Sequence, residues 1–166
     1  MATAGKNLSE HSTNDILPLE DVRIGIVLSE WNNDITDRLL DGALTFLSDR
    51  IKEEDILTYR VPGSFELPLG AQWLFEEEDV DAVICIGCVI RGETAHFDFV
   101  SQACAQGVME VGLKHSRPVI FCVLTDDNKE QSLARSGGVH GNKGVEAAVS
   151  AWKMIQVQRT LGSGDR

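Results

Sequence analysis

The sequence predicts an α/β protein in three layers, with a central four-stranded parallel sheet and helices on both faces. The strongest indication is the nearly unbroken apolar run Val83–Ile90, which is rich in β-branched residues and typical of a strand covered on both sides. The second is that four apolar runs alternate with helical patterns, as in consecutive βαβ units. The third is size, because 166 residues with 43% hydrophobic content can form one core without disulfides.

The N-terminal part is expected to be a tail followed by the first strand and helix. Residues 1–20 are polar and without periodicity, so we predict a flexible tail, then one domain over residues 21–166. The first strand is expected at Arg23–Leu28, which is apolar after its first residue. A helix should begin near Asn33 or Asp34, both good N-caps. Its inner face is expected to carry Ile35, Leu39, Ala43, Phe46 and Leu47.

The middle of the chain repeats the strand-helix pattern twice. A second strand is expected at Ile56–Val61, and the segment PGSFELP leads from it into a helix that runs through Phe75. The third strand, Val83–Ile90, ends at a turn that contains Gly92, and the next helix should extend to about His115. The inner face of that helix is expected to carry Phe97, Val100, Cys104, Val108 and Val111.

The C-terminal part supplies the last strand and two helices. The strand is expected at Pro118–Thr125, a short helix should end at Arg135, and Ser136–Asn142 should be a loop. The loop contains GGVHGNKG, but it follows a helix and lacks the Gly-Lys-Ser/Thr ending, so a nucleotide-triphosphate loop is excluded. The last helix is expected from Lys143. Its inner face should carry Val145, Ala148, Val149, Trp152 and Ile155.

Charge and hydropathy exclude several classes of partner. The net charge of −11 and the pI near 4.7 speak against a nucleic-acid backbone or an anionic membrane, so an anionic ligand would need a local group of cations. No apolar segment approaches the roughly 20 residues of a membrane helix. The start of the chain lacks the basic and apolar regions of a secretory signal. We therefore expect a cytoplasmic protein.

The four cysteines agree with a reducing compartment. Cys85 and Cys88 form a C-x-x-C pattern, which in a loop would indicate a redox or zinc site. Here they lie in a predicted strand, three residues apart, so their side chains should point to opposite faces and share neither a metal nor a disulfide. Both are expected in the core, and no metal site is predicted.

Candidate ligand-binding residues follow the predicted strands, where open α/β sheets bind their ligands. Gly92–Thr94 form a turn before a helix that starts near His96, and an imidazole beside such a helix start is the best chemical indication in the chain. Trp31, after the first strand, is either a ring packed on the surface or a stacking platform for a flat ligand. Ser64 and Glu66 are either helix caps or ligand contacts.

The assembled motifs resemble those of the 6,7-dimethyl-8-ribityllumazine synthase family. The matching segments, in order, are RIGIVLSEWN, VPGSFELP, IGCVIRGETAHFDFV, FCVLTDDN and GNKGVEAA. The combination of PGSFELP with RGETAHFDFV, each after a predicted strand, is highly specific. The resemblance covers almost all of the chain after the tail and implies a flavodoxin-like fold.

The resemblance also implies an activity. The family's transferases condense 5-amino-6-(D-ribitylamino)uracil with 3,4-dihydroxy-2-butanone 4-phosphate to 6,7-dimethyl-8-ribityllumazine, phosphate and water, the penultimate step of riboflavin biosynthesis. Its chemistry needs neither a metal nor an organic cofactor.

The resemblance further implies a role for each matching position in the binding of the aminouracil. Trp31 would stack on its ring. Ser64 and Glu66 would hold the ribityl chain, with Phe65 between them as a further contact. The residues whose main chain would bind the polar atoms of the pyrimidine are Cys88, Val89 and Ile90.

Other matching positions imply a phosphate site and a proton carrier. The turn that would receive the phosphate consists of Gly92, Glu93 and Thr94, with the Glu93 side chain expected to face away. His96 would transfer protons. The groups implied to reach the site from an adjacent subunit are Phe121, Arg135 and Lys143, so that a monomer would hold half a site. Many members have Lys and Ala where this chain has Val139 and His140, which removes one positive charge near the phosphate.

The resemblance implies a homopentamer, and the short GNKG connection is similar to that of members whose pentamers assemble into an icosahedral capsid. Three alternatives remain at this point: an archaeal-type riboflavin synthase, a non-catalytic flavin-binding module, and a shell protein whose enzymatic site has decayed. Arg135 and the RGET turn favour an enzyme that binds phosphate, because an uncharged flavin needs no such group. The presence of His96 and Arg135 speaks against a decayed site.

Overall fold

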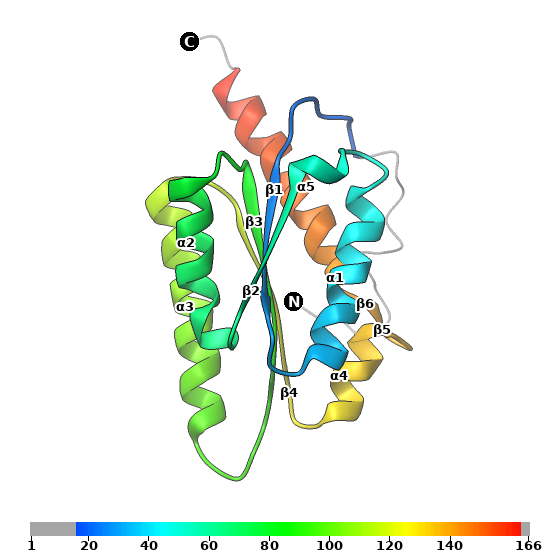
Figure 1. Ribbon diagram of the computed structural model, residues 1–166, viewed down its shortest axis with the longest axis vertical. Coiled ribbons are helices and arrows are strands. Elements are labelled where there is room, and N and C mark those ends of the chain that lie inside the picture. The colour runs from blue at the N-terminus through cyan, green and yellow to red at the C-terminus, as the bar shows by residue number, and fades with distance from the viewer. Residues whose placement is uncertain (1–15, 164–166) are drawn as a thin grey trace.

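The computed structural model of the chain describes residues 16–163. Residues 1–15 and 164–166 lie outside the described residues, and with them lies most of the predicted tail, 1–20. Strands and helices alternate along the chain from Ile24 onward, as the sequence predicts (Figure 1).

A four-stranded parallel sheet forms the middle layer. Its strands are β1 (Ile24–Ser29), β2 (Ile56–Val61), β3 (Ala82–Ile90) and β4 (Val119–Asp126), in the order β2-β1-β3-β4. Because every pairing is parallel, the four carboxyl ends lie at one edge of the sheet, at the lower end of Figure 1. The predicted sheet is confirmed. β4 begins just after Pro118, which has no N–H to donate to a neighbouring strand.

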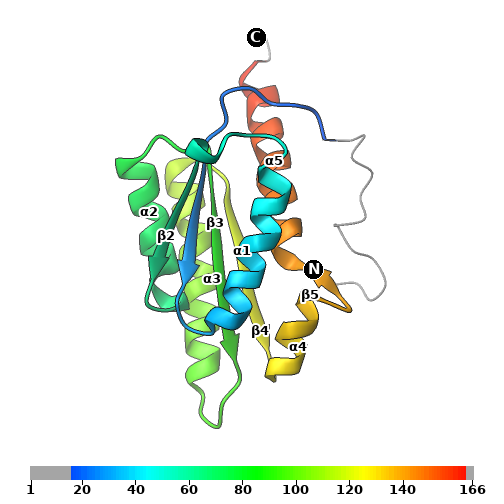
Figure 2. The same ribbon diagram turned by 45° about the vertical axis from the view of Figure 1, so that its right-hand side comes forward.

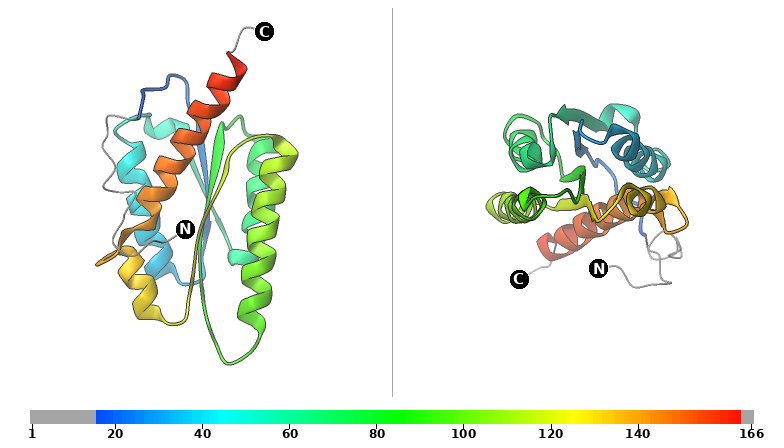
Figure 3. Two further views of the ribbon diagram at one scale, coloured as in Figure 1. Left: turned by 180° about the vertical axis from the view of Figure 1, so that it is seen from behind. Right: turned by 90° about the horizontal axis from the view of Figure 1, so that it is seen from below.

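Helices cover both faces of the sheet. One face carries α2 (Leu67–Glu77) and α3 (His96–His115), and the other carries α1 (Asn33–Leu47), α4 (Lys129–Arg135) and α5 (Lys143–Gly162). Short 3₁₀ turns at Glu53–Asp55 and Ser64–Glu66 precede β2 and α2. The view from below in Figure 3 shows the sheet between the two helical layers, which confirms the predicted three-layer fold.

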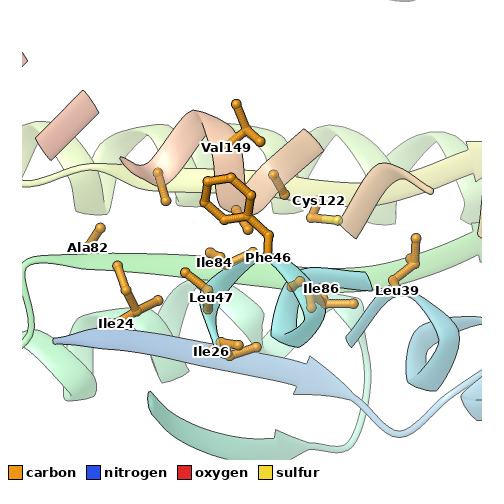
Figure 4. Packing of buried hydrophobic residues seen from close by; sticks show 14 of the residues in the cluster. Ile24, Ile26, Leu39, Phe46, Leu47, Ala82, Ile84, Ile86, Cys122 and Val149 are labelled. Carbon is orange, nitrogen blue, oxygen red and sulfur yellow. The ribbon is translucent and has the colours of Figure 1, made fainter. Parts of the chain in front are cut away.

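Two hydrophobic cores stabilise the fold, one on each face of the sheet. The larger lies between the sheet and helices α1 and α5, and Figure 4 shows Ile26 and Ile84 of the sheet on the side of Leu47 of α1. The second lies between the sheet and helices α2 and α3. Cys88 belongs to the first core and Cys85 to the second, which confirms that the two thiols point to opposite faces.

The helices bury the faces that their residue spacing predicts. All five predicted residues of α1 are buried, and so are those of α3 and α5 except Val100 and Val145, which are half-buried. Val100 stays partly accessible because it lines a pocket at the carboxyl edge of the sheet.

The segment predicted as a loop between two helices forms a small hairpin instead. β5 (Ser136–Gly138) pairs with β6 (Gly141–Asn142) in antiparallel orientation, next to α4 in Figure 2. Gly137 and Gly141 have φ angles of 109° and 74°, a conformation that L side chains rarely adopt. Glycine is therefore needed at both positions for the chain to turn between α4 and α5.

Residues 16–21, which include the last part of the predicted tail, lie along α5. The buried Trp152 donates its Nε1–H to the carbonyl of Leu17 at 2.9 Å, and Arg159 donates to the carbonyl of Glu20 at 2.6 Å. A buried indole N–H needs an acceptor, and the chain before β1 supplies it. This part of the segment expected to be flexible is thus held by its own domain.

Candidate active site

A pocket of about 760 Å³ opens at the carboxyl edge of the sheet, between the ends of β1 and β3, the turn before α2 and the first turns of α3. Its volume suits a small organic ligand. The predicted site residues that line it are Trp31, Ser64, Phe65, Glu66, Cys88, Val89, Ile90, Gly92, Thr94 and His96. The fold thus brings together segments that are far apart in the sequence.

The other predicted site residues, Glu93, Phe121, Arg135 and Lys143, do not line this pocket. Phe121 borders a different groove, between α3, β4 and α5. Arg135, at the end of α4, has its Nε 3.8 Å from a carboxylate oxygen of Asp126. Lys143, at the start of α5, has its Nζ 2.7 Å from Glu146. The described chain therefore places its predicted phosphate-binding cations outside its own pocket.

Exposed aromatic side chains form walls of the pocket. Trp31 is 73% exposed, so its ring is presented to the pocket and not packed into the domain surface. Phe65 and Phe99 are also exposed, at 60% and 71%. Phe99 was not among the predicted site residues. The sequence feature that could have indicated it is an aromatic residue outside the predicted inner face of α3. A flat ligand could bury these rings, which a monomer leaves in water.

Asn32 is a second pocket residue that the sequence reasoning missed. It has the left-handed conformation, with φ of 60° and ψ of 44°, and occupies the N-cap position of α1. The helix begins at Asn33 as expected, but the Asn32 side chain makes no capping hydrogen bond. Its Nδ2 instead donates to the carbonyl of Cys88 at 2.9 Å, which ties the end of β1 to the end of β3. The sequence feature that could have indicated Asn32 is an Asn directly after an aromatic residue at the end of a strand.

Ser64 and Glu66 lie in the 3₁₀ turn before α2. Glu66 occupies the N-cap position of α2, but neither residue makes a capping hydrogen bond through its side chain. The Ser64 hydroxyl is buried without a hydrogen-bond partner among the described residues. It faces β3, because a Cβ placed on Gly87 would lie 2.6 Å from it. The Ser64 hydroxyl is thus turned toward the sheet, whereas Glu66 is partly exposed and lines the pocket.

The turn before α3 presents backbone groups and an imidazole. His96 is the first residue of α3 and is exposed, and its backbone N–H donates to Thr94 Oγ1 at 3.4 Å. Arg91 precedes the turn but is engaged elsewhere, 3.1 Å from Asp98 and 3.2 Å from Asp127. The hydrogen bond to Asp98 is the main cause of the raised pKa of the Arg91 guanidinium.

The charge of the pocket is unsuited to a phosphate by itself. No Lys or Arg is among the residues that line it, and Glu66 contributes a carboxylate. The remaining attraction for an anion comes from the positive end of the α3 dipole, beside the His96 imidazole. A phosphate substrate needs a cation from outside this set of residues.

Within residues 16–163, no group of three or more His, Cys, Asp or Glu side chains is arranged to hold a metal ion. None of the helices in this part of the chain is long and apolar enough to cross a membrane.

The parallel three-layer fold defines a flavodoxin-like α/β protein, and the pocket at its carboxyl edge has the size of a small-molecule site. The family model for 6,7-dimethyl-8-ribityllumazine synthase matches residues 21–159. The chain belongs to this family, whose members are transferases. Its reaction is the condensation of 5-amino-6-(D-ribitylamino)uracil with 3,4-dihydroxy-2-butanone 4-phosphate to 6,7-dimethyl-8-ribityllumazine, the penultimate step of riboflavin biosynthesis.

Relatives named 6,7-dimethyl-8-ribityllumazine synthase match over most of their length. The protein of Flavobacterium johnsoniae is 52% identical over 160 residues, which are 96% of this chain and 84% of the relative. That of Cytophaga hutchinsonii is 54% identical over 156 residues, 93% of this chain and 98% of the relative. That of Parabacteroides distasonis is 50% identical with the same coverage. The riboflavin synthase and flavin-binding alternatives are set aside by these matches.

Proposed function

We propose that the pocket binds the aminouracil along the end of β3. β1 pairs with β3 only as far as Leu28 opposite Ile86. On the β1 side, Cys88, Val89 and Ile90 therefore extend past their strand neighbour, and all three line the pocket. The Cys88 carbonyl accepts from Asn32. Strand-edge N–H and C=O groups can bind the polar atoms of a pyrimidine, while the exposed Trp31 ring stacks on its face.

The turn before α2 is proposed to hold the ribityl chain. The Glu66 carboxylate can accept hydrogen bonds from sugar-type hydroxyls, and it makes no side-chain hydrogen bond to the described residues. Ser64 contributes its main chain, because its hydroxyl faces β3. Phe65, 60% exposed, covers the ligand from the same turn.

The phosphate of the second substrate is proposed to lie at the start of α3. The backbone amides of Gly92, Glu93 and Thr94 precede this helix, and its N-terminus favours an anion. Arg135 and Lys143 supply the positive charge, Arg135 as a planar fork for two phosphate oxygens. The observation that carries the proposal is the pocket's lack of a lining Lys or Arg, which supports a second subunit as the source of Arg135 and Lys143, and with them Phe121.

An oligomer is supported by two apolar grooves at opposite edges of the sheet. One, between α3, β4 and α5, includes the exposed side chains of Leu113 and Leu161. The other, along β2 and α2, includes those of Tyr59 and Trp73. Two different patches that face away from each other suit a head-to-tail contact, which closes into a ring. We propose a homopentamer with active sites at subunit interfaces, and an icosahedral capsid of such pentamers.

The proposed mechanism combines positioning with proton transfer. The 5-amino group attacks the ketone carbon, and loss of water gives an imine. Elimination of phosphate follows, and the ribitylamino nitrogen then closes the second ring with loss of another water. Holding the two substrates together can lower the barrier by ~7–11 kcal/mol. General acid-base catalysis typically contributes about 10²–10⁴-fold. His96, exposed beside the phosphate turn, can move the protons of imine formation and phosphate departure.

The compartment, the cofactor requirement and the partners of the protein are also proposed. We place the protein in the cytoplasm, because its four cysteines are free thiols, all buried. Its chemistry requires no metal or organic cofactor, and its partners are its substrates and its own copies. We keep residues 21–166 as one domain and residues 1–20 as a tail, of which residues 16–20 lie against α5.

Steady-state kinetics on Arg135→Ala and His96→Ala test the site. We expect Arg135→Ala to lower kcat/KM more, because it removes the orientation of the phosphate, whereas the imidazole mainly relays protons. Formation of the fluorescent lumazine gives the rate. Arg38→Ala, an exposed arginine on α1 away from the pocket, is the matched control and should retain wild-type kinetics.

A much slower His96→Ala enzyme with unchanged KM values would reverse this ranking and make proton transfer the dominant contribution. Wild-type kinetics in Arg135→Ala would remove Arg135 from the phosphate site.

A further inference from the structure

Asp126 is a buried carboxylate at the end of β4, between the turn that precedes α3 and Arg135 at the end of α4. It is the last residue of β4, opposite Ile90 at the end of β3, and is 8% exposed. Its backbone carbonyl accepts from the N–H of Arg91, the residue just before the phosphate turn, at 3.0 Å. The main chain of Asp126 is therefore fixed relative to that turn.

The carboxylate of Asp126 has two side-chain partners on α4. Its Oδ2 accepts a hydrogen bond from Ser132 Oγ at 2.8 Å, and its Oδ1 lies 3.8 Å from Arg135 Nε. Ser132 is fully buried, and its hydroxyl also accepts from the thiol of Cys88 at 3.5 Å. A continuous polar chain thus runs from β3 through Ser132 and Asp126 to the guanidinium of Arg135.

This arrangement constrains the Arg135 side chain on two sides. Asp126 faces its Nε, and its Nη1 donates to the carbonyl of Gln131 at 2.9 Å. Within residues 16–163, Nη2 has no hydrogen-bond partner. Because the guanidinium is planar, the contacts with Asp126 and Gln131 set the direction of its outer edge. This edge keeps N–H groups free for an oxyanion.

The Asp126 carboxylate needs partners that replace the water it loses on burial. A buried carboxylate is costly unless it is hydrogen-bonded and paired with a cation. Here one partner is a neutral hydroxyl, and the cation is the residue proposed to bind phosphate. An apolar residue could hold α4 against the sheet without this cost, so anchoring the helix does not by itself account for a buried acid at this position.

We propose that Asp126, held by Ser132, is a positioning residue that orients the Arg135 guanidinium toward the phosphate of 3,4-dihydroxy-2-butanone 4-phosphate. The inference rests on the proposed phosphate-binding role of Arg135. It adds a residue that touches no substrate and acts through Arg135, from the subunit that donates this arginine.

The test is a double-mutant cycle between Asp126→Asn and Arg135→Lys, read as KM for each substrate. Asn keeps the size and an acceptor for Ser132 but loses the charge that faces Arg135. Asp126→Asn should raise KM for the butanone phosphate roughly tenfold, because the guanidinium loses the charge that orients it. KM for the aminouracil should stay within about twofold, since the aminouracil carries no phosphate. In the Arg135→Lys background the same change should have little further effect, because Lys has no Nε–H fork to orient.

Two further variants control for charge and for folding. Glu130→Gln removes the same charge from an exposed position on α4 and should leave both KM values unchanged. Ser132→Ala removes the hydroxyl that holds Asp126 and should also raise KM for the butanone phosphate selectively. If Asp126→Asn does not fold, the KM values of Ser132→Ala test the inference instead.

Additive effects of Asp126→Asn and Arg135→Lys, or equal increases in both KM values, would overturn the inference and leave Asp126 a structural contact of α4. An unchanged KM for the butanone phosphate in Arg135→Lys and Arg135→Ala would contradict the proposed phosphate site itself. The two failures are therefore distinguishable.

Discussion

Asn32 shows how one side chain can set the distance between two walls of the pocket. Its Nδ2 donates to the Cys88 carbonyl, while its own carbonyl accepts from the amides of Ile35 and Thr36. Asn is among the few non-glycine residues that tolerate its left-handed conformation, with φ of 60°. The backbone next to Trp31 is thereby fixed relative to the end of β3.

Also at the residue scale, burial makes the core thiols poor acids. Removal from water raises the pKa of Cys104 to about 11 and that of Cys122 to about 12. In the unfolded chain a thiol ionises near 9.0, so the folded state keeps its proton to a higher pH. The contribution of each buried thiol to the free energy of unfolding is therefore complete below pH 9.0. It is lost as pH rises from 9.0 toward the folded pKa, at up to about 1.4 kcal/mol per pH unit for each thiol.

Urea unfolding followed between neutral and alkaline pH measures this loss. The free energy of unfolding should fall as pH rises above 9.0, and less steeply in Cys122→Val, a change of similar size without a titrating group. Native thiols should resist a thiol-specific reagent below that pH. Rapid labelling of the folded protein, or an identical pH dependence in the variant, would contradict the role of burial.

At the scale of elements, the start of α5 is fixed by a close approach to α1. A Cβ at Gly144 would collide with the backbone carbonyl oxygen of Leu39. Asn142 completes the junction, because its Oδ1 accepts from the Gly144 N–H at 2.8 Å and its Nδ2 donates to the Arg38 carbonyl at 2.8 Å. Since Lys143 lies between these two residues, its position depends on the contact between the helices.

Gly144→Ala should therefore lower the free energy of unfolding by about 2 kcal/mol or more, as a backbone cannot move aside like a side chain. Gly162→Ala is the matched control in the last turn of the same helix, where a Cβ meets no atom within 4 Å. Because Ala is the better helix former, it should be neutral or stabilising by up to about 1 kcal/mol. Chemical denaturation of both variants gives the comparison, and equal stability would mean that α5 shifts at little cost.

At the scale of the whole molecule, our proposal makes the completeness of the active site depend on assembly. The two apolar grooves lie at opposite edges of the sheet, and the pocket has no lining cation of its own. Both features are explained if a neighbouring subunit covers the grooves and brings Arg135 and Lys143 to the pocket. Activity should therefore require association.

Sedimentation or light scattering measures the mass of the assembly. A pentamer of the 18.2 kDa chain has a mass of about 91 kDa (five times 18.2), and a shell of twelve pentamers is twelve times heavier. We expect the mass of the shell. A mass near that of a lone pentamer would refute the capsid but keep the composite site, whereas an active monomer would refute both. Leu113→Asp, in the groove between α3 and α5, should lower both mass and activity.

Much of the fold and of the site followed from the sequence alone. Hydrophobic periodicity located the four strands of the sheet and five helices, because a strand buried on both faces and a helix with one buried face leave different spacings. The fold class, the opposite orientation of Cys85 and Cys88, and the pocket segments around Trp31 and His96 were predicted for the same reason. Parallel strands place their carboxyl ends together whatever the details of packing.

Only the tertiary structure decided the contacts between residues far apart in the chain. The Asn32 bond to Cys88, the burial of the Ser64 hydroxyl against Gly87, and the polar chain from Ser132 to Arg135 depend on distances across the sheet. Local spacing does not encode such distances, because each side chain takes the direction that its packed neighbours allow. The sequence by itself therefore determined which segments form the pocket, and the packing of these segments against one another determined which atoms face it.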